Sequence, residues 1–279
     1  MTVTAATRLL VLLGDPVGHS ASPDMQNAGF AKAGVDGVYV TLSCGADELA
    51  GLVRGIARAG GGGNVTLPHK QRAAGLLDEA SEAVWRTGAC NTFWGDEKGR
   101  VHGDNTDVEG FRRALRSFLS EPIAGRRVLL LGAGGAARAV LLALMREEVE
   151  GVTLFNRTPE HARAVARRIG GERARVLDEA SNLKGMEFDL VVNATPLGLA
   201  PDDPSPIDFG ALGTVGAAMD LVYAPQPTAF VRAADRQGVR VTDGLEMLVQ
   251  QGAVAFERWW NVEAPVDAMR DALDGASGA

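Results

Sequence analysis

"RVLLLGAGGAARAVLLALM" occupies residues 127–145 and indicates the architecture of the chain more strongly than any other segment. An apolar run of strand length ends in Gly132, Gly134 and Ala137, in the pattern G-x-G-x-x-A, and an apolar run of helical length follows. Gly132 permits a tight turn, Gly134 lets a pyrophosphate approach the backbone, and Ala137 allows close packing of helix on strand. The free N–H groups and the dipole of the helix N-terminus also attract an anion. This context favours a dinucleotide-binding loop over a plain glycine turn.

The strand that follows this loop indicates which dinucleotide is bound. An NAD site has Asp or Glu at the end of that strand, where it binds the ribose 2′-hydroxyl. Here "VTLF" is followed instead by Asn156, Arg157 and Thr158. An arginine can pair with a 2′-phosphate and stack on adenine, and the two neutral residues supply hydrogen bonds. The alternative is that Arg157 is a surface charge beside a helix. The pattern favours NADP.

Strand and helix patterns alternate over the first hundred residues. Strands are expected at 8–14, 38–44 and 63–68, and helices at 22–34, with Ser22 as N-cap and Pro23 at N1, and at 47–60. Strands joined by helices of this length predict right-handed crossovers and a mainly parallel sheet. Residues 90–107, "CNTFWGDEKGRVHGDNTD", predict a hairpin instead, because two short extended segments flank the turn "GDEKG".

A second alternating unit begins after an expected helix over 107–119. Its strands are expected at 127–131, 151–156, 188–195, 217–223 and 239–244, and a long amphipathic helix at 243–260. Two such units, joined near residue 107, predict an α/β enzyme of two domains with a cleft between them.

Composition excludes several classes of function. The net charge is −7, aromatic residues make up 5% of the chain, and no basic run of five residues occurs, which disfavours nucleic-acid binding. Two cysteines make neither a disulfide framework nor a zinc cluster, and the four histidines lack metal-binding spacing, so we expect no metal. The apolar run 9–13 is too short to span a bilayer and follows no basic region. We therefore expect a cytoplasmic protein without membrane partners.

Polar residues gather where strands of the first unit are expected to end, at the sheet edge where parallel sheets bind ligands. They are Ser20, Ser22, Thr66, Lys70, Asn91 and Asp107. Hydroxyls, an amide, a lysine and a carboxylate suit a small, polyhydroxylated, anionic ligand. Each residue has a structural alternative, since Ser22 or Asp107 could cap a helix and Asn91 could hold a turn. Lys70 and Asp107 are the candidate acid–base pair.

The chain resembles the shikimate dehydrogenase family over nearly its whole length. The resemblance is carried by "GDPVGHSASP", "NVTLPHK", "GACNTF", "GDNTDVEGF", "GAGGAARA", "NRT", "NATPLG", "DLVYAPQPT" and "DGLEMLVQQGAVAFERW". It implies reversible, NADPH-dependent reduction of 3-dehydroshikimate to shikimate in aromatic amino-acid biosynthesis, with Lys70 and Asp107 as the catalytic pair. It also implies that Ser20 and Ser22 bind the substrate carboxylate. The rest of the substrate pocket would comprise Asn64, Thr66, Asn91, Tyr223 and Gln251.

The resemblance further implies where NADP binds and how the domains are composed. The cofactor would be held by Gly132, Ala133, Gly134, Gly135, Ala136, Asn156, Arg157 and Thr158, with Leu221 and Gly244 near the nicotinamide. A substrate domain would comprise 1–106 and 244–279, and a Rossmann-like NADP-binding domain 107–243. Two rival functions are a quinate or aminoshikimate dehydrogenase of the same family and a non-catalytic NADPH-binding redox sensor. Both a monomer and a homodimer suit such a chain.

Overall fold

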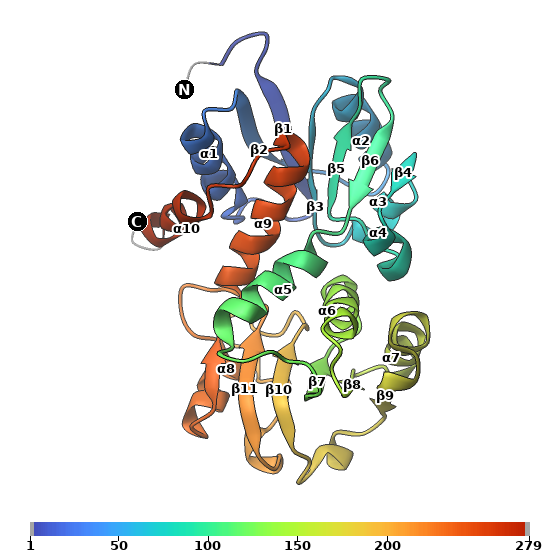
Figure 1. Cartoon of the computed structure of the whole chain (residues 1–279), viewed down its shortest axis with the longest axis vertical. Helices are drawn as coiled ribbons and strands as arrows, with labels where there is room; N and C mark the ends of the chain where they lie inside the picture. The colour runs from blue at the N-terminus through green and yellow to red at the C-terminus, as the bar shows by residue number, and fades with distance from the viewer. Residues whose placement is uncertain (1–2, 277–279) are drawn as a thin grey trace. The chain divides into compact units, whose positions relative to one another are not determined.

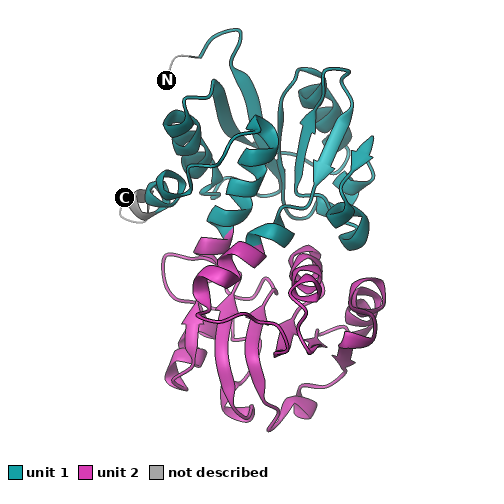
Figure 2. Ribbon diagram, in the orientation of Figure 1, with its two compact units in different colours: residues 1–110, 248–279 teal, residues 111–247 magenta. Residues whose placement is uncertain are grey.

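A computed structural model describes residues 3–276 of the chain, with side-chain surroundings up to residue 273. The chain divides into two compact units, 1–110 with 248–279 and 111–247 (Figure 2). It leaves the first unit within helix α5 (Asp107–Phe118) and re-enters it within helix α9 (Leu245–Trp260). These divisions fall four residues after the expected boundaries at 106 and 243.

The first unit contains a six-stranded sheet in the order β2-β1-β3-β5-β6-β4. Its strands are β1 (Arg8–Gly14), β2 (Gly37–Ser43), β3 (Gly62–Val65), β4 (Glu79–Ala80), β5 (Thr92–Gly95) and β6 (Val101–Asp104). Strands β2, β1 and β3 are mutually parallel, as expected. Strands β5 and β6 are antiparallel and form the predicted hairpin, which joins β3 in antiparallel pairing. The short strand β4 was not predicted and pairs with β6 in parallel.

The first unit also contains helices that connect or follow these strands. They are α1 (Ser22–Ala33), α2 (Leu49–Arg58), α3 (Lys70–Ala74), α4 (Glu82–Thr87), the C-terminal part of α9, and α10 (Val266–Ala276). Val53 and Ile56 of α2 belong to the same buried cluster as Val11 and Leu13 of β1, and the apolar residues of α2 recur at helical spacing. Helix α10, which was not predicted, lies beside α1 (Figure 1).

The second unit has a sheet of six parallel strands in the order β12-β11-β10-β7-β8-β9. The strands are β7 (Arg127–Leu131), β8 (Gly151–Phe155), β9 (Ala174–Leu177), β10 (Phe188–Asn193), β11 (Val215–Asp220) and β12 (Arg240–Thr242). Read from the other edge and numbered within the unit, this is the order 3-2-1-4-5-6 of a Rossmann fold. The prediction of a Rossmann-like unit is therefore confirmed.

The helices of the second unit connect these strands. They are α6 (Gly135–Arg146), α7 (Pro159–Val165) and α8 (Ala229–Arg236), with a single π-helical turn at Ala166–Gly170 and short 3₁₀ helices at Gly171–Arg173, Ala180–Leu183 and Phe209–Ala211. Helix α6 is the most buried, and Ala137, Val140, Leu141 and Leu144 are fully inaccessible to solvent.

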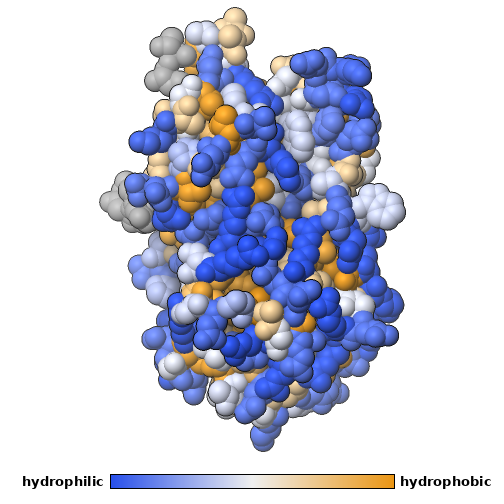
Figure 3. All heavy atoms as spheres, in the orientation of Figure 1, coloured by the Kyte–Doolittle hydropathy of each residue, from blue (hydrophilic) through white to orange (hydrophobic). Residues whose placement is uncertain are grey.

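Hydrophilic residues, drawn in blue, predominate on the face shown in Figure 3. None of the helices in the described part of the chain combines the length and apolarity that crossing a bilayer requires.

Candidate functional site

Lys70 and Asp107 form a largely buried ion pair in the first unit. Lys70 is the first residue of α3 and Asp107 the first residue of α5. The Lys70 Nζ lies 2.6 Å from the Asp107 Oδ2, and the two side chains are 16% and 7% exposed. A short charge-assisted hydrogen bond of this kind holds the ammonium group in one position. The remaining exposure leaves the lysine accessible to a small molecule.

Asn91 orients the Asp107 carboxylate. Its Nδ2 donates to Asp107 Oδ1 at 2.9 Å and to Thr106 Oγ1 at 3.0 Å. Its Oδ1 accepts from the Thr106 N–H at 2.7 Å and from the Thr92 hydroxyl at 3.0 Å. Because the backbone N–H of Thr106 fixes which way the amide points, the NH₂ group faces the carboxylate. One oxygen of Asp107 is thus bound by Asn91 and the other by Lys70.

Asn64 is held by an extension of the same buried network. The Tyr39 hydroxyl donates to Asn64 Oδ1 at 2.8 Å, and Asn64 Nδ2 donates to Thr92 Oγ1 at 2.9 Å and to the Asn91 carbonyl at 3.1 Å. Tyr39, Thr92 and Thr106 were not among the predicted residues. Thr92 and Thr106 sit within the quoted motifs "GACNTF" and "GDNTDVEGF", which was a usable signal, whereas Tyr39 lies in an ordinary apolar strand.

Ser20 and Ser22 lie together before α1. The Ser20 hydroxyl donates to Ser22 Oγ at 3.1 Å and also accepts from the Ser22 N–H at 3.2 Å. The expectation that Ser22 caps the helix was wrong. The N-cap position is Ala21, and α1 has no side-chain cap, because Ser22 already has helical geometry. The Ser22 hydroxyl is therefore not used for capping.

Gln251 reaches the same region from α9. Its Oε1 lies 3.5 Å from the Asn91 Nδ2, and its Nε2 donates to the Leu248 carbonyl at 2.8 Å. A Cβ at Gly110 would lie 2.6 Å from the Gln251 Cα, so only glycine lets α5 and α9 approach this closely. Thr66 follows β3 and is partly buried.

The surroundings of His19, His69 and the two cysteines assign none of them to the Lys70–Asp107 site. The buried His69 contacts the Cys44 carbonyl oxygen through Nε2 at 2.8 Å, which accounts for it without a role in a pocket. His19 is exposed. Cys44 and Cys90 are buried and free, and burial raises the pKa of the Cys90 thiol to about 12. Among residues 3–276 there is no group of His, Cys, Asp or Glu side chains that could hold a metal ion.

The glycine loop of the second unit combines a tight turn at Gly132 with an exposed backbone at Gly134. Gly132 has φ of 109°, and a Cβ there would lie 2.8 Å from the Ala194 carbonyl oxygen. Gly134 is the N-cap of α6, and a Cβ built on it meets no atom within 4 Å beyond its chain neighbours. The backbone is thus open to a ligand at the N-terminus of α6. Ala133, Gly135 and Ala136 complete the loop and the first helical turn.

The residues after β8 suit a phosphate. The Asn156 side chain donates to the Thr158 carbonyl at 2.8 Å and tightens the turn. Thr158 is the N-cap of α7 and makes no side-chain cap hydrogen bond. Arg157 is exposed and has no ion-pair partner among the described residues. Its guanidinium group is therefore available to a ligand.

Leu221 and Gly244 lie against each other in the second unit. A Cβ at Gly244 would lie 2.2 Å from the Leu221 carbonyl oxygen, and the Gly244 N–H donates to the Val222 carbonyl at 3.1 Å. Tyr223 follows on the same segment and is partly exposed. The predicted site residues thus fall into two groups, one on each unit.

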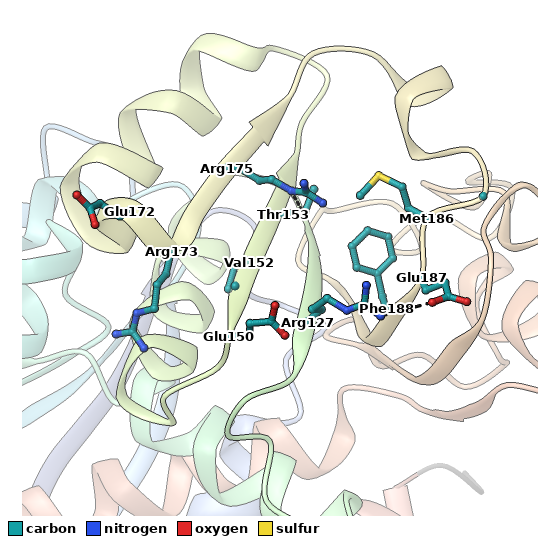
Figure 4. Close-up of a pocket in the computed structure, with 12 residues that line it drawn as sticks. Arg127, Glu150, Val152, Thr153, Glu172, Arg173, Arg175, Met186, Glu187 and Phe188 are labelled. Atoms are coloured by element: carbon teal, nitrogen blue, oxygen red, sulfur yellow. Dashed lines mark hydrogen bonds and ion pairs between the residues drawn. The ribbon is translucent and has the colours of Figure 1, made fainter.

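A cavity of about 620 Å³ in the second unit is separate from these groups (Figure 4). It opens at the amino ends of the strands, where Arg127, Gly151 and Phe188 begin β7, β8 and β10. Figure 4 shows Arg127 directed toward Glu187, 3.5 Å away. Ligands of Rossmann folds bind at the carboxyl ends instead. The glycine loop lies at that opposite end of the strands, away from this cavity.

Comparisons with known proteins agree along the chain. Family models match at residues 12–93 (shikimate dehydrogenase substrate binding domain), 114–197 (shikimate / quinate 5-dehydrogenase) and 244–273 (shikimate 5′-dehydrogenase C-terminal domain). Shikimate dehydrogenase (NADP(+)) of Rubrobacter xylanophilus is 43% identical over 98% of each chain. That of Salinibacter ruber is 40% identical over 98% of this chain and 99% of its own. The crystal structure of shikimate 5-dehydrogenase from Thermus thermophilus with NADP(H) and shikimate has a TM-score of 0.88 at 38% identity, covering 97% of this chain and 100% of that one.

Proposed function

The chain belongs to the shikimate dehydrogenase family, and we propose that it catalyses the reversible NADPH-dependent reduction of 3-dehydroshikimate to shikimate. It is an NADP-dependent oxidoreductase that acts on a secondary alcohol. Its place is in the shikimate pathway, which leads to chorismate and the aromatic amino acids. The observation that carries the chemistry is the Lys70–Asp107 pair, buried and oriented by Asn91.

Lys70 is the proton donor in the direction of reduction. When the ketone of the substrate becomes an alkoxide, the ammonium group stabilises the developing charge and gives up a proton to that oxygen. Asp107 holds the ammonium in position with a 2.6 Å contact and balances its charge. In the reverse direction the neutral amine accepts the hydroxyl proton.

The remaining polar residues of the first unit recognise the substrate. Ser20 and Ser22 offer adjacent hydroxyls to its carboxylate. The amides and hydroxyls of Asn64, Thr66 and Gln251 suit its ring hydroxyls, and Tyr223 offers a phenolic hydroxyl of the same kind. Asn91 has a double role, because its amide contacts both Asp107 and the pocket residue Gln251.

The second unit binds NADP. When bound, the reduced cofactor supplies the hydride. The open backbone at Gly134 and the N-terminus of α6 receive the pyrophosphate. Arg157 pairs with the 2′-phosphate, because no carboxylate occupies the position that would bind a 2′-hydroxyl. Leu221 and Gly244 lie at the nicotinamide end.

One assay distinguishes shikimate from quinate as the substrate and NADP from NAD as the cofactor. Initial rates are measured with shikimate and with quinate, each with NADP and with NAD. The proposal predicts that the pair shikimate and NADP has by far the highest kcat/KM. Comparable rates with quinate would identify a quinate dehydrogenase, and no turnover with tight NADPH binding would identify a redox sensor.

We place the enzyme in the cytoplasm. This is supported by two buried, unpaired cysteines, which suit a reducing compartment, and by the use of NADPH. Fractionation of the source cells with an antibody to the chain tests the location. Recovery outside the cytoplasmic fraction would contradict it.

A further inference from the structure

Asp220 is a fully buried carboxylate at the carboxyl end of β11, in the unit that binds NADP, and it was not among the predicted site residues. Its Oδ2 accepts from the Thr228 hydroxyl at 2.5 Å. Its Oδ1 accepts from Asn193 Nδ2 at 2.8 Å and from the Val222 N–H at 3.0 Å. Three donors converge on one side chain that takes no part in the chemistry proposed above.

The donors come from three different segments at the carboxyl ends of the strands. Asn193 ends β10, Val222 follows β11, and Thr228 is the N-cap of α8. The segment from Leu221 to Tyr223 leaves the sheet directly after Asp220. Asp220 holds this segment through the Val222 N–H and holds the start of the next helix through the Thr228 hydroxyl. Leu221 is also held at its own N–H, which donates to the Asn193 carbonyl at 3.0 Å.

Asn193 extends the network to the loop after β10. Its Oδ1 accepts from the Thr195 N–H at 3.0 Å and from the Thr195 hydroxyl at 2.7 Å. That loop in turn touches the glycine loop, since a Cβ at Gly132 would lie 2.8 Å from the Ala194 carbonyl oxygen. The loops after β7, β10 and β11 are thus interlocked at the end of the sheet where the cofactor binds.

We propose that Asp220 is the positioning residue that sets the Leu221–Tyr223 segment, and through it the nicotinamide end of the NADP site. The inference rests on the proposed function, because that function assigns the segment to the nicotinamide and the substrate. Asp220 touches neither ligand. It acts by fixing the Val222 backbone and the start of α8, so that Leu221 and Tyr223 are presented in one arrangement.

The burial of the Asp220 carboxyl group sets it apart from a solvent-exposed carboxylate. Desolvation raises the pKa of Asp220, and the nearby Asp243 raises it further, while the bonds from Thr228, Val222 and Asn193 oppose both effects. A carboxylate buried this deeply requires hydrogen-bond donors, and Asn193, Val222 and Thr228 supply them.

The experiment compares two ligands of the folded protein. NADPH binding is followed by its fluorescence, and adenosine 2′,5′-bisphosphate, which lacks the nicotinamide, is measured by competition. Asp220→Asn keeps the shape but turns a donor toward Thr228, and Thr228→Val removes the hydroxyl. Each should weaken NADPH binding about five- to ten-fold and lower kcat about ten-fold or more, with bisphosphate binding within two-fold of wild type.

Three further variants complete the test. Thr228→Ser keeps the hydroxyl and should bind NADPH like the wild type. The double variant Asp220→Asn/Thr228→Val should lose little more than either single one, because both act through one hydrogen bond. Asp189→Asn is the matched control: its carboxylate accepts the Arg127 N–H at 2.8 Å at the other end of the same sheet, and its NADPH binding should be unchanged.

The outcomes separate this inference from the proposed function. Equal loss of both ligands, or NADPH affinity and kcat within two-fold of wild type in Asp220→Asn and Thr228→Val, would overturn the positioning role. A wild-type protein that binds NADPH but does not reduce 3-dehydroshikimate would refute the proposed function alone. In that case the two dissociation constants still decide whether Asp220 sets the nicotinamide end.

Discussion

Asn91→Ala is the substitution that most sharply separates orientation of the catalytic pair from stability of the fold. It removes the donor 2.9 Å from Asp107 Oδ1 and the acceptor 2.7 Å from the Thr106 N–H. A hydrogen bond to a charged group contributes about 1.5–3 kcal/mol, so kcat/KM should fall roughly 10- to 150-fold. The orphaned N–H should also cost about 1–3 kcal/mol of unfolding free energy.

The matched control for this variant is Asn105→Ala. Asn105 is a neighbouring amide, 1% exposed, whose Nδ2 donates to Thr87 Oγ1 at 3.0 Å rather than to Asp107. Both variants are assayed by steady-state kinetics with shikimate and NADP, and by urea unfolding. Asn105→Ala should lose stability but keep kcat/KM within about three-fold. If Asn91→Ala also keeps it, Asn91 does not orient the catalytic carboxylate.

Three other predictions concern the cofactor, the β5–β6 hairpin and the thiols. Arg157→Ala should raise the KM for NADPH roughly 10- to 150-fold and change the KM for NADH little. Equal changes in the two KM values would show that Arg157 does not bind the 2′-phosphate. Hydrogen bonds, foremost from the Arg100 N–H, hold the pKa of Asp96 well below its usual value of 3.8. The ionised Asp96 side chain therefore stabilises the fold fully above about pH 3.8, and this stabilisation is lost as the pH falls further. The difference in unfolding free energy between wild type and Asp96→Asn should accordingly narrow between pH 6 and pH 3. A difference that stays constant over this range would contradict the prediction. Burial raises the pKa of both Cys44 and Cys90, so Ellman's reagent at pH 8 should react only slowly with the native protein. In urea, where the chain is unfolded, the same reagent should react readily with both thiols. Rapid labelling of the native protein would contradict the burial of the two side chains.

The sequence predicted both sheets because their strands are apolar and regularly separated by helices, but short elements at the periphery escaped it. Strand β9 has four residues and includes the exposed Arg175, so its alternation is too brief to recognise. Helix α10 buries Met269 and Leu273, four residues apart, and this single apolar stripe follows the last helix that was predicted. Its place against α1 depends on Gly29, where a Cβ would lie 3.0 Å from the Met269 side chain.

Residue types predicted which groups meet in the first unit, but not how they are oriented. Lys70 and Asp107 were expected together because each follows a strand end. The direction of the Asn91 amide was not predictable, since it depends on a hydrogen bond from the backbone N–H of Thr106, which is 15 residues away in the chain. Ser22 was assigned a cap because serine usually caps, whereas the helix begins one residue earlier.

Lys70→Ala tests the central claim, that Lys70 is the proton donor. The assay is kcat for shikimate oxidation by NADP and for the reverse reaction, with NADPH affinity measured in parallel to show that the second unit is intact. Loss of a general acid–base group should lower kcat about 10²- to 10⁴-fold, with a modest change in KM. A kcat within five-fold of wild type in a variant that binds NADPH normally would contradict the account.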